Sequence, residues 1–380
     1  MPLQFCVSQQ QNTEPFSFKT TGIRVYTFEE ALYHVYHNWR ESVDEFLSEK
    51  MISWVAEIGH SYLSARMKEL RRKEPFTARM LDFLKLTPYF GEEEIASIKA
   101  SLEEWELRRE WEQLKERGDF FARRKEPNKA IPLYKRALQF TENAALLNNL
   151  GIQYMQVSAL QEGLSCLTRA LSLEPKNFSI LLHYIEAAIL NGDYNKAAKA
   201  IKKAHEQNPE NADIEFLRGL MEFEKKDNTA ALSHFEKAME MDKTVSYYAH
   251  KAIDIHLHMR RFEKALDVLK KTHPNAEYFA KEAEIYAACG DNARAIKSMQ
   301  QAIIYNADAS QYAKLAAYHR LDYDTASAET VIQKALTLSP ENNIVRLENA
   351  RIKKGLGRTR EYQAVLNEIL KSFKDDYRSD

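Results

Sequence analysis

Residues 144–177 read AALLNNLGIQYMQVSALQEGLSCLTRALSLEPKN, and this stretch decides the fold. Apolar residues recur at helical spacing in two runs that are separated by a turn near Ser158, so the stretch predicts two amphipathic helices. Gly151, Gly163 and Ala170 are small residues on the faces where the two helices would meet, and they allow the backbones to approach closely. Pro175 ends the unit, because proline cannot continue a helix. The stretch therefore predicts a helical hairpin.

The same pattern returns along most of the chain. Aligning the small residues places unit starts near 111, 144, 178, 212, 246, 276, 309 and 343, at intervals of 33, 34, 34, 34, 30, 33 and 34 residues. The small position of the first helix is occupied in turn by Gly118, Gly151, Ile185, Gly219, Ile253, Ala283, Ala316 and Ala350. The fifth unit is shortened near His273 and Pro274, and the eighth has bulky Tyr362 and Ile369 where alanines are expected.

This 34-residue helix–turn–helix pattern resembles the tetratricopeptide repeat (TPR) over residues 111 to about 375. The resemblance implies an all-α fold, a superhelical solenoid of α–α repeats, in which first helices line a concave groove and second helices form the outer wall. We predict a loosely ordered arm at 1–22, an N-terminal helical bundle at 23–110, about eight repeats at 111–375 and a polar tail at 376–380.

Within the predicted bundle, capping residues suggest where helices begin. Thr27 with Glu30 predicts one helix start, and Ser42 with Glu45 predicts a longer helix that closes at residues 71–73. A further helix should begin after Gly91 and run unbroken into the first repeat, at residues 92–118. His34 and His37 lie one turn apart, but no acid or cysteine at matching spacing supports a metal site, so we interpret them as ordinary surface or edge residues.

Composition excludes several functional classes. The 54 Lys and Arg residues nearly balance 55 Asp and Glu residues, so no global field would attract nucleic acid or an anionic membrane. The three cysteines are far apart, which argues against a disulfide framework or zinc knuckle and favours the cytoplasm. No apolar run is long enough to span a bilayer, and the first residues lack a signal-peptide pattern.

The resemblance also implies which residues would face a ligand, because groove positions can be carried from unit to unit. This gives a groove that is apolar and aromatic in the middle, with acids on one side and arginines further along. Such an exposed apolar surface commonly marks a contact site. The groove residues are Asn148, Ile152, Met155, Leu182, Glu186, Ile189, Phe216, Leu220, Phe223, His250, Asp254, His258, Glu284, Ala313, Ala317, Arg320 and Arg351.

His250, Asp254 and His258 could suggest a metal site, since they are four residues apart on one helix. The first and last would lie about 12 Å apart along the helix axis, however, which is too far for a single ion. We therefore predict no metal and no cofactor, and a hydrogen-bonding, pH-sensitive patch instead.

The leading functional hypothesis is a non-catalytic adaptor that binds a segment of another protein in the groove. The sequence has no phosphate loop, nucleophile elbow, kinase signature or metalloprotease helix, so we predict no enzyme activity. Two alternatives stay open. One is a peptide-sensing regulator, since a bundle followed by such repeats resembles bacterial peptide-responsive phosphatases and transcription regulators. The other is a self-assembling structural protein.

Overall fold

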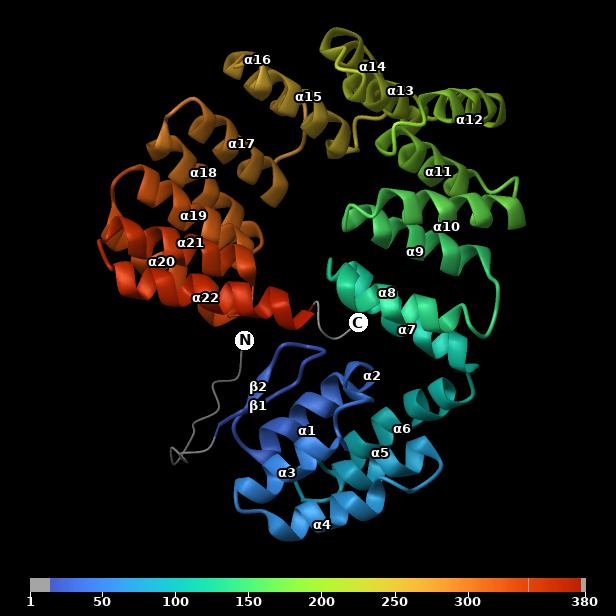
Figure 1. The fold of residues 1–380 in the computed structure, drawn as a ribbon, viewed down its shortest axis with the longest axis vertical. Coiled ribbons are helices and arrows are strands. Elements are labelled where there is room, and N and C mark those ends of the chain that lie inside the picture. Colours follow the sequence, from blue (N-terminus) through green and yellow to red (C-terminus); the bar gives the residue numbers. More distant parts are fainter. Residues whose placement is uncertain (1–13, 341, 377–380) are drawn as a thin grey trace. The chain divides into compact units, whose positions relative to one another are not determined.

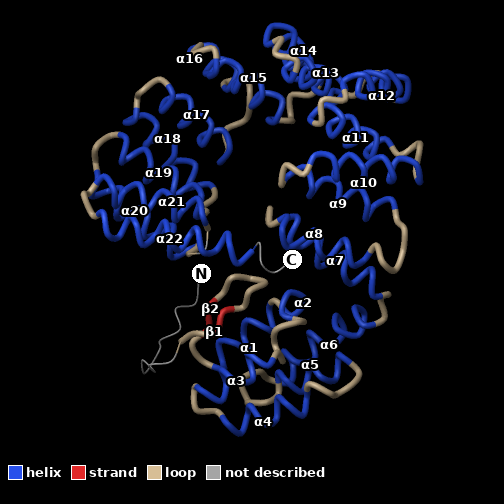
Figure 2. Tube along the Cα trace, viewed as in Figure 1, coloured by secondary structure: helices blue, strands red, loops and turns tan. Residues whose placement is uncertain are grey.

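The computed structural model describes residues 14–340 and 342–376 and contains almost only helices (Figures 1 and 2). The chain divides into two compact units, Met1–Lys176 and Asn177–Asp380. The first unit begins with a short antiparallel hairpin and a group of short helices, followed by two helix pairs. The hairpin and short helices are β1 Phe16–Ser17, β2 Arg24–Val25, α1 Phe28–His37, α2 Trp39–Ser42, α3 Glu49–Glu57, α4 Ser61–Leu70, α5 Phe76–Leu84 and α6 Glu92–Glu106.

An aromatic core holds these short elements together. Phe28, Phe46 and Phe83 are buried, and the Phe83 ring contacts that of Phe46 at 5.1 Å and that of Phe28 at 6.0 Å between centroids, both edge to face. Trp39 and Trp105 meet in the same way at 5.4 Å, which ties α2 to α6. A helical bundle is therefore present, as predicted, and it belongs to the same compact unit as the first two helix pairs.

Two expectations for this region were wrong. Residues 14–22 do not behave as a loose arm, because Phe16 and Phe18 are buried in the bundle core and β1 pairs with β2; residues 1–13 lie outside the described part. The long helix expected after Ser42 is two helices, α3 and α4. Ser48 caps α3 instead, and Gly59 separates the two helices with a φ of 96°, which favours glycine.

The helix expected to run unbroken through residues 92–118 also breaks, at Leu107–Arg109. In a continuous helix Trp105 and Leu114 would be nine residues, or 900°, apart, and would therefore point to opposite sides. Trp105 packs in the bundle core, whereas Leu114 packs in the core of the first helix pair. The break lets each side chain reach its own core, although the sequence has no proline or glycine there.

From Glu110 onward the chain forms successive helix pairs. Those of the first unit are α7 Glu110–Arg123 with α8 Pro127–Ala137, and α9 Ala144–Gln156 with α10 Leu160–Leu173. Those of the second unit are α11 Phe178–Leu190 with α12 Tyr194–Gln207, α13 Ala212–Glu224 with α14 Asn228–Met241, α15 Ser246–His258 with α16 Phe262–Leu269, α17 Ala276–Ala288 with α18 Asn292–Tyr305, α19 Ala309–Leu321 with α20 Thr325–Leu338, and α21 Asn343–Gly355 with α22 Thr359–Asp376.

A residue with positive φ marks the turn inside every pair and supports the predicted period independently. These residues are Lys125, Ser158, Gly192, Lys226, Arg260, Gly290, Tyr323 and Gly357. Their numbers differ by 33, 34, 34, 34, 30, 33 and 34, the same series as the unit starts. The turn expected near Ser158 is thus confirmed. The fifth unit is shorter because its second helix, α16, has 8 residues, whereas the second helices of the units before and after it, α14 and α18, have 14 each.

The glycines of the first helices make room for a large side chain sixteen residues later. A Cβ atom added to Gly118 would lie 2.6 Å from the Tyr134 ring, one on Gly151 would lie 2.7 Å from Leu167, and one on Gly219 would lie 2.6 Å from the Phe235 ring. Tyr134, Leu167 and Phe235 are fully buried. The small residues therefore allow each pair to pack closely, as the sequence indicated.

We expect Gly219→Ala to lower the free energy of unfolding by about 1–3 kcal/mol, because the new methyl group overlaps the Phe235 ring. Alanine recovers at most ~1 kcal/mol of helix propensity. Urea denaturation followed by circular dichroism measures the difference. Gly355→Ala is the matched control, since nothing lies within 4 Å of its added Cβ atom. Equal stability changes in the two variants would contradict this account of the packing.

Candidate binding site on the first-helix face

The second unit carries a cavity of about 500 Å³ on the face made by its first helices. Figure 1 shows α11, α13, α15 and α17 following one another along the inside of an arc of helix pairs. The cavity is lined by Phe223, Phe235, Lys251, Asp254, Leu257, His258, Lys281, Glu284 and Ala288. Four of the predicted groove residues, Phe223, Asp254, His258 and Glu284, therefore lie around one hollow.

Lys281 organises the polar side of this cavity. Its ammonium group lies 2.8 Å from Asp254 and 3.0 Å from Glu284, and only 14% of its side chain is exposed. Burial alone would lower the pKa of Lys281, but the hydrogen bonds and charges of Asp254 and Glu284 outweigh burial and raise it. The cation is thus fixed between two carboxylates on neighbouring helices, α15 and α17.

Charged groups next to the cavity are less fully compensated. Burial raises the pKa of Glu186 on α11, and its carboxylate has no hydrogen bond or ion pair among the described residues. Lys251 partly offsets this effect and Asp213 adds to it. Burial, together with Glu186 and Asp254, raises the pKa of Tyr247 to about 12. This part of the face therefore carries a carboxylate without an ion pair among the described residues, close to an aromatic hydroxyl.

The predicted apolar anchors Phe216 and Leu220 are core residues, so their assignment to a ligand surface was wrong. They are 5% and 2% exposed. Gly219 leaves space for the Phe235 ring, and Phe216 stacks on that ring at 5.3 Å while also contacting Tyr248. Ile189 and Ala313 are buried too. Phe216 therefore packs in the core, between the Phe235 and Tyr248 rings.

The other predicted groove residues have varied surroundings. In the first unit Asn148, Ile152 and Met155 lie half-buried on α9. In the second unit Leu182 is half-buried on α11, and Arg320 donates to Glu348 at 2.7 Å instead of lining the cavity. Arg351, near the end of the chain, also pairs with Glu348, at 3.2 Å.

Two of the histidines considered for metal binding, His250 and His34, lie in half-buried and buried surroundings. His250 is half-buried and its pKa is lowered, first by burial and then by the charge of Lys281. In the bundle, His34 is buried, not a surface residue, and burial lowers its pKa to about 4. Across the described residues no group of three metal-ligating side chains comes together.

Sequence reasoning missed Lys251 and Lys281, which supply the cations of the cavity. They lie 30 residues apart, the spacing between the fifth and sixth units, and so occupy the same repeat position. In each unit this position comes directly after the predicted groove position that His250 occupies in the fifth unit. Two lysines recurring at one position of adjacent units were the available signal.

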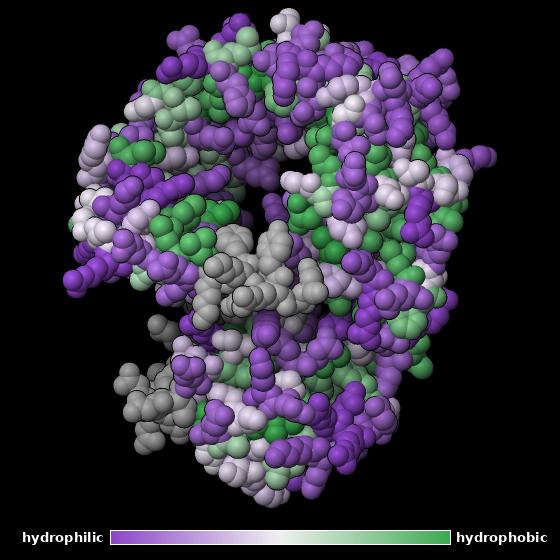
Figure 3. Space-filling view, viewed as in Figure 1, coloured by the Kyte–Doolittle hydropathy of each residue, from purple (hydrophilic) through white to green (hydrophobic). Residues whose placement is uncertain are grey.

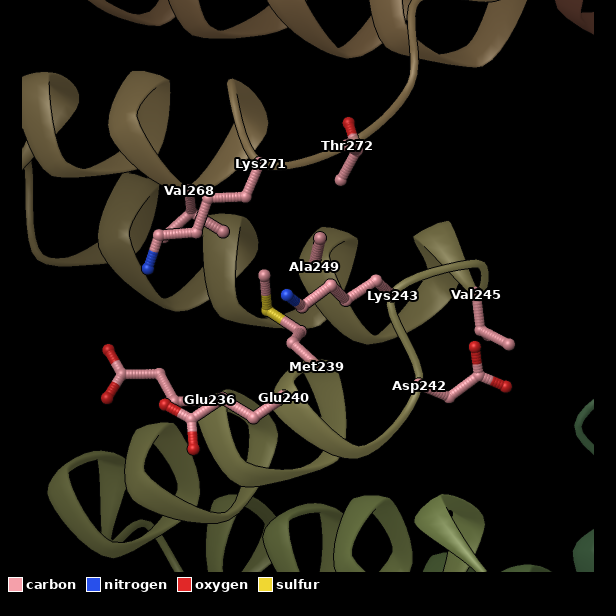
Figure 4. A pocket seen from close by; sticks show the side chains of 10 residues that line it. All are labelled: Glu236, Met239, Glu240, Asp242, Lys243, Val245, Ala249, Val268, Lys271 and Thr272. Carbon is pink, nitrogen blue, oxygen red and sulfur yellow. The ribbon is translucent and has the colours of Figure 1, made fainter.

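A second cavity, of about 350 Å³, lies beside the shortened fifth unit. It lies between α14, the start of α15 and the end of α16, where Met239 points toward Ala249 and Val268 (Figure 4). Lysine side chains and carboxylates line this second cavity together. On the face shown in Figure 3, hydrophilic residues cover most of the surface and hydrophobic residues form smaller groups between them.

The helix pairs, their period and their glycine packing define a helical-repeat protein. A family model described as tetratricopeptide repeat matches residues 187–244, which span α12, α13, α14 and the end of α11. Residues 187–244 therefore belong to the tetratricopeptide repeat family, and the helix pairs before and after them follow the same period. No helix among the described residues is both long and apolar enough to cross a membrane.

Relatives share parts of the chain. BBSome complex member BBS4 of Bos taurus is 27% identical over 153 residues, which is 40% of this chain and 30% of that protein. TPR repeat-containing protein MJ1428 of Methanocaldococcus jannaschii is 25% identical over 200 residues, 47% of this chain and 35% of that protein. The chain thus spans about a third of the length of these relatives. The crystal structure of a tetratricopeptide repeat protein from Parabacteroides merdae covers 65% of this chain and 98% of that chain, at 21% identity and a TM-score of 0.42.

Proposed function

We propose that the chain is a non-catalytic adaptor that binds a segment of another protein in the first-helix cavity of the second unit. The observation that carries this proposal is the combination of lining groups. Phe223, Leu257 and Ala288 offer apolar contacts beside the fixed Asp254–Lys281–Glu284 arrangement. A polypeptide needs both kinds of contact, because apolar side chains supply affinity and polar groups fix register.

The charges favour a segment that presents lysine or arginine. Lys281 is shared by two carboxylates, and Glu186 on the same face has no cationic partner within ion-pair distance among the described residues. An arriving cation would compensate Glu186 without disturbing the existing pairs. The naming of one relative as a member of the BBSome complex supports a role within a protein assembly.

We expect Phe223→Ala to weaken binding by about 1–3 kcal/mol, the usual cost of removing an aromatic anchor. The probe is a 12-residue peptide selected from a random phage-displayed library on the full chain, and fluorescence polarisation measures its affinity. Phe223 is half-buried at the cavity, so thermal stability should change little. Phe140→Ala, at a 52% exposed aromatic residue of the first unit, is the control and should bind normally.

Salt dependence then reports on charge. A steep loss of affinity between low and physiological salt, abolished by Glu186→Gln, would identify a basic ligand. A flat response would leave the apolar contacts as the source of affinity. Equal binding by Phe223→Ala and the unaltered chain would reject the cavity as the site.

The two rival functions predict different observations. A peptide-sensing regulator requires a short peptide to raise the melting temperature, whereas an adaptor requires a larger protein to copurify at low salt. A self-assembling structural protein requires sedimentation that depends on concentration, so a concentration-independent profile would exclude it.

A further inference from the structure

The helix break at Leu107–Arg109 creates a crevice of about 330 Å³ within the first unit, between the bundle and the first helix pair. Arginines from three places line it: Arg108 in the break, Arg117 on α7 and Arg136 on α8. Trp105, at the end of α6, lines the same crevice and is anchored against Trp39. Asp44 and Glu110 are the carboxylates of the lining.

Two residues that line this crevice carry buried hydrogen-bond donors without an acceptor among the described residues. The Nε1 atom of Trp105 and the Nε atom of Arg117 are buried and have no hydrogen-bond partner among the described residues, and the two residues are only 5% and 8% exposed. The Trp105 carbonyl is already used, since it accepts from Gln113 at 2.9 Å. Buried donors without acceptors are uncommon in proteins, so their presence on one crevice suggests a ligand with acceptor oxygens.

Arg117 is the buried charged residue among those that line the crevice. Arg117 pairs with Asp44, but the Arg117 side chain is 9% exposed and that of Asp44 is 61% exposed. Arg136 pairs with Glu110 at 2.8 Å, and both side chains are about half exposed. Arg108 is held by Glu104 and Glu116 outside the lining. The Arg136–Glu110 pair is exposed and therefore weak, and each guanidinium has five donors, so Arg117 and Arg136 can each donate to a further oxygen.

We infer that this crevice binds an oxyanion, either a carboxylate or a phosphate group. The indole of Trp105 and the guanidinium groups of Arg117 and Arg136 donate to its oxygens. Arginine suits this task because its planar array of donors matches the oxygens of carboxylates and phosphates. The site lies in the first unit and is separate from the first-helix cavity of the second unit.

The test uses the full chain with ¹⁵N-labelled tryptophan indoles and follows the Trp105 indole resonance by NMR. Trp105→Phe assigns that resonance; if this variant does not fold, the three variants at the other tryptophans assign it by elimination. Sodium phosphate and sodium acetate are titrated separately at constant ionic strength, with sodium chloride as reference. We expect a saturable shift of the Trp105 signal. Response to phosphate alone assigns a phosphate group, and response to acetate alone assigns a carboxylate.

Two matched variants separate the crevice from general charge effects. Arg136→Gln should weaken the saturating anion by about 10–100-fold, the loss expected for a hydrogen bond to a charged group. Arg169→Gln is the control variant, because Arg169 lies 33 residues after Arg136 at the same repeat position and also pairs with an exposed glutamate, Glu142. The Arg169→Gln variant should bind the anion as the unaltered chain does. A Trp105 signal that moves with neither anion, or an affinity that Arg136→Gln leaves unchanged, would overturn the inference.

Discussion

Phe235→Ala should lower the free energy of unfolding by about 3–5 kcal/mol, the range for removing a buried phenylalanine ring. Phe235 on α14 is 0% exposed, covers Gly219 and stacks against Phe216 at 5.3 Å. Removing the ring leaves a cavity between α13 and α14 and deprives Phe216 of one of its stacking partners. Chemical denaturation at equilibrium measures the effect.

A double-mutant cycle tests the physical cause. If Gly219→Ala is harmful because its methyl group meets the Phe235 ring, the penalty should disappear in the Phe235→Ala background. Phe223→Ala is the control for loss of an aromatic ring at a half-buried position of the same helix pair. A loss below ~1 kcal/mol in Phe235→Ala, or strictly additive effects in the cycle, would show that the ring does not fill the space beside Gly219.

The repeat fold was predictable because one small position recurs along the chain. Gly118, Gly151 and Gly219 each precede by sixteen residues the large side chain that fills their space. This local rule repeats in sequence and needs no knowledge of distant contacts. The turns follow the same period, so the ends of the helix pairs also could be read from the sequence.

Features that depend on competition between two cores were not predictable in the same way. The apolar residues of 92–118 look continuous in sequence, but Trp105 and Leu114 belong to different cores. The arginine crevice depends on that break and was therefore missed. The residues at the Phe216 position in the two neighbouring units, Leu182 and His250, are half-buried. Phe216 itself turns inward because its ring fits beside that of Phe235.

The second large effect concerns the junction between the bundle and the first helix pair. We expect Arg117→Ala to lower the free energy of unfolding by about 1–3 kcal/mol at pH 7, because it removes a buried side chain and its hydrogen bond, whereas Asp44 is left largely exposed to water. Arg117 also acts on Glu41, which is 8% exposed. Burial raises the pKa of Glu41, while its own backbone amide and the charges of Arg40, Arg117 and Arg124 lower it.

The pH dependence of this loss distinguishes a charge effect from packing, and the Glu41→Gln variant tests whether Glu41 is its cause. Without Arg117 the pKa of Glu41 rises further in the folded state. A raised folded pKa adds stability below the unfolded pKa, near 4.5, and that stability is lost as the pH rises through the folded value. The cost of Arg117→Ala should therefore be larger at pH 7 than at pH 4, as measured by urea denaturation at each pH.

Glu41→Gln should remove most of that difference, and Arg123→Ala, at an exposed arginine of the same helix, should be nearly neutral. An equal loss at both pH values would assign the effect to packing, and no loss would show that this arginine does not hold the junction together.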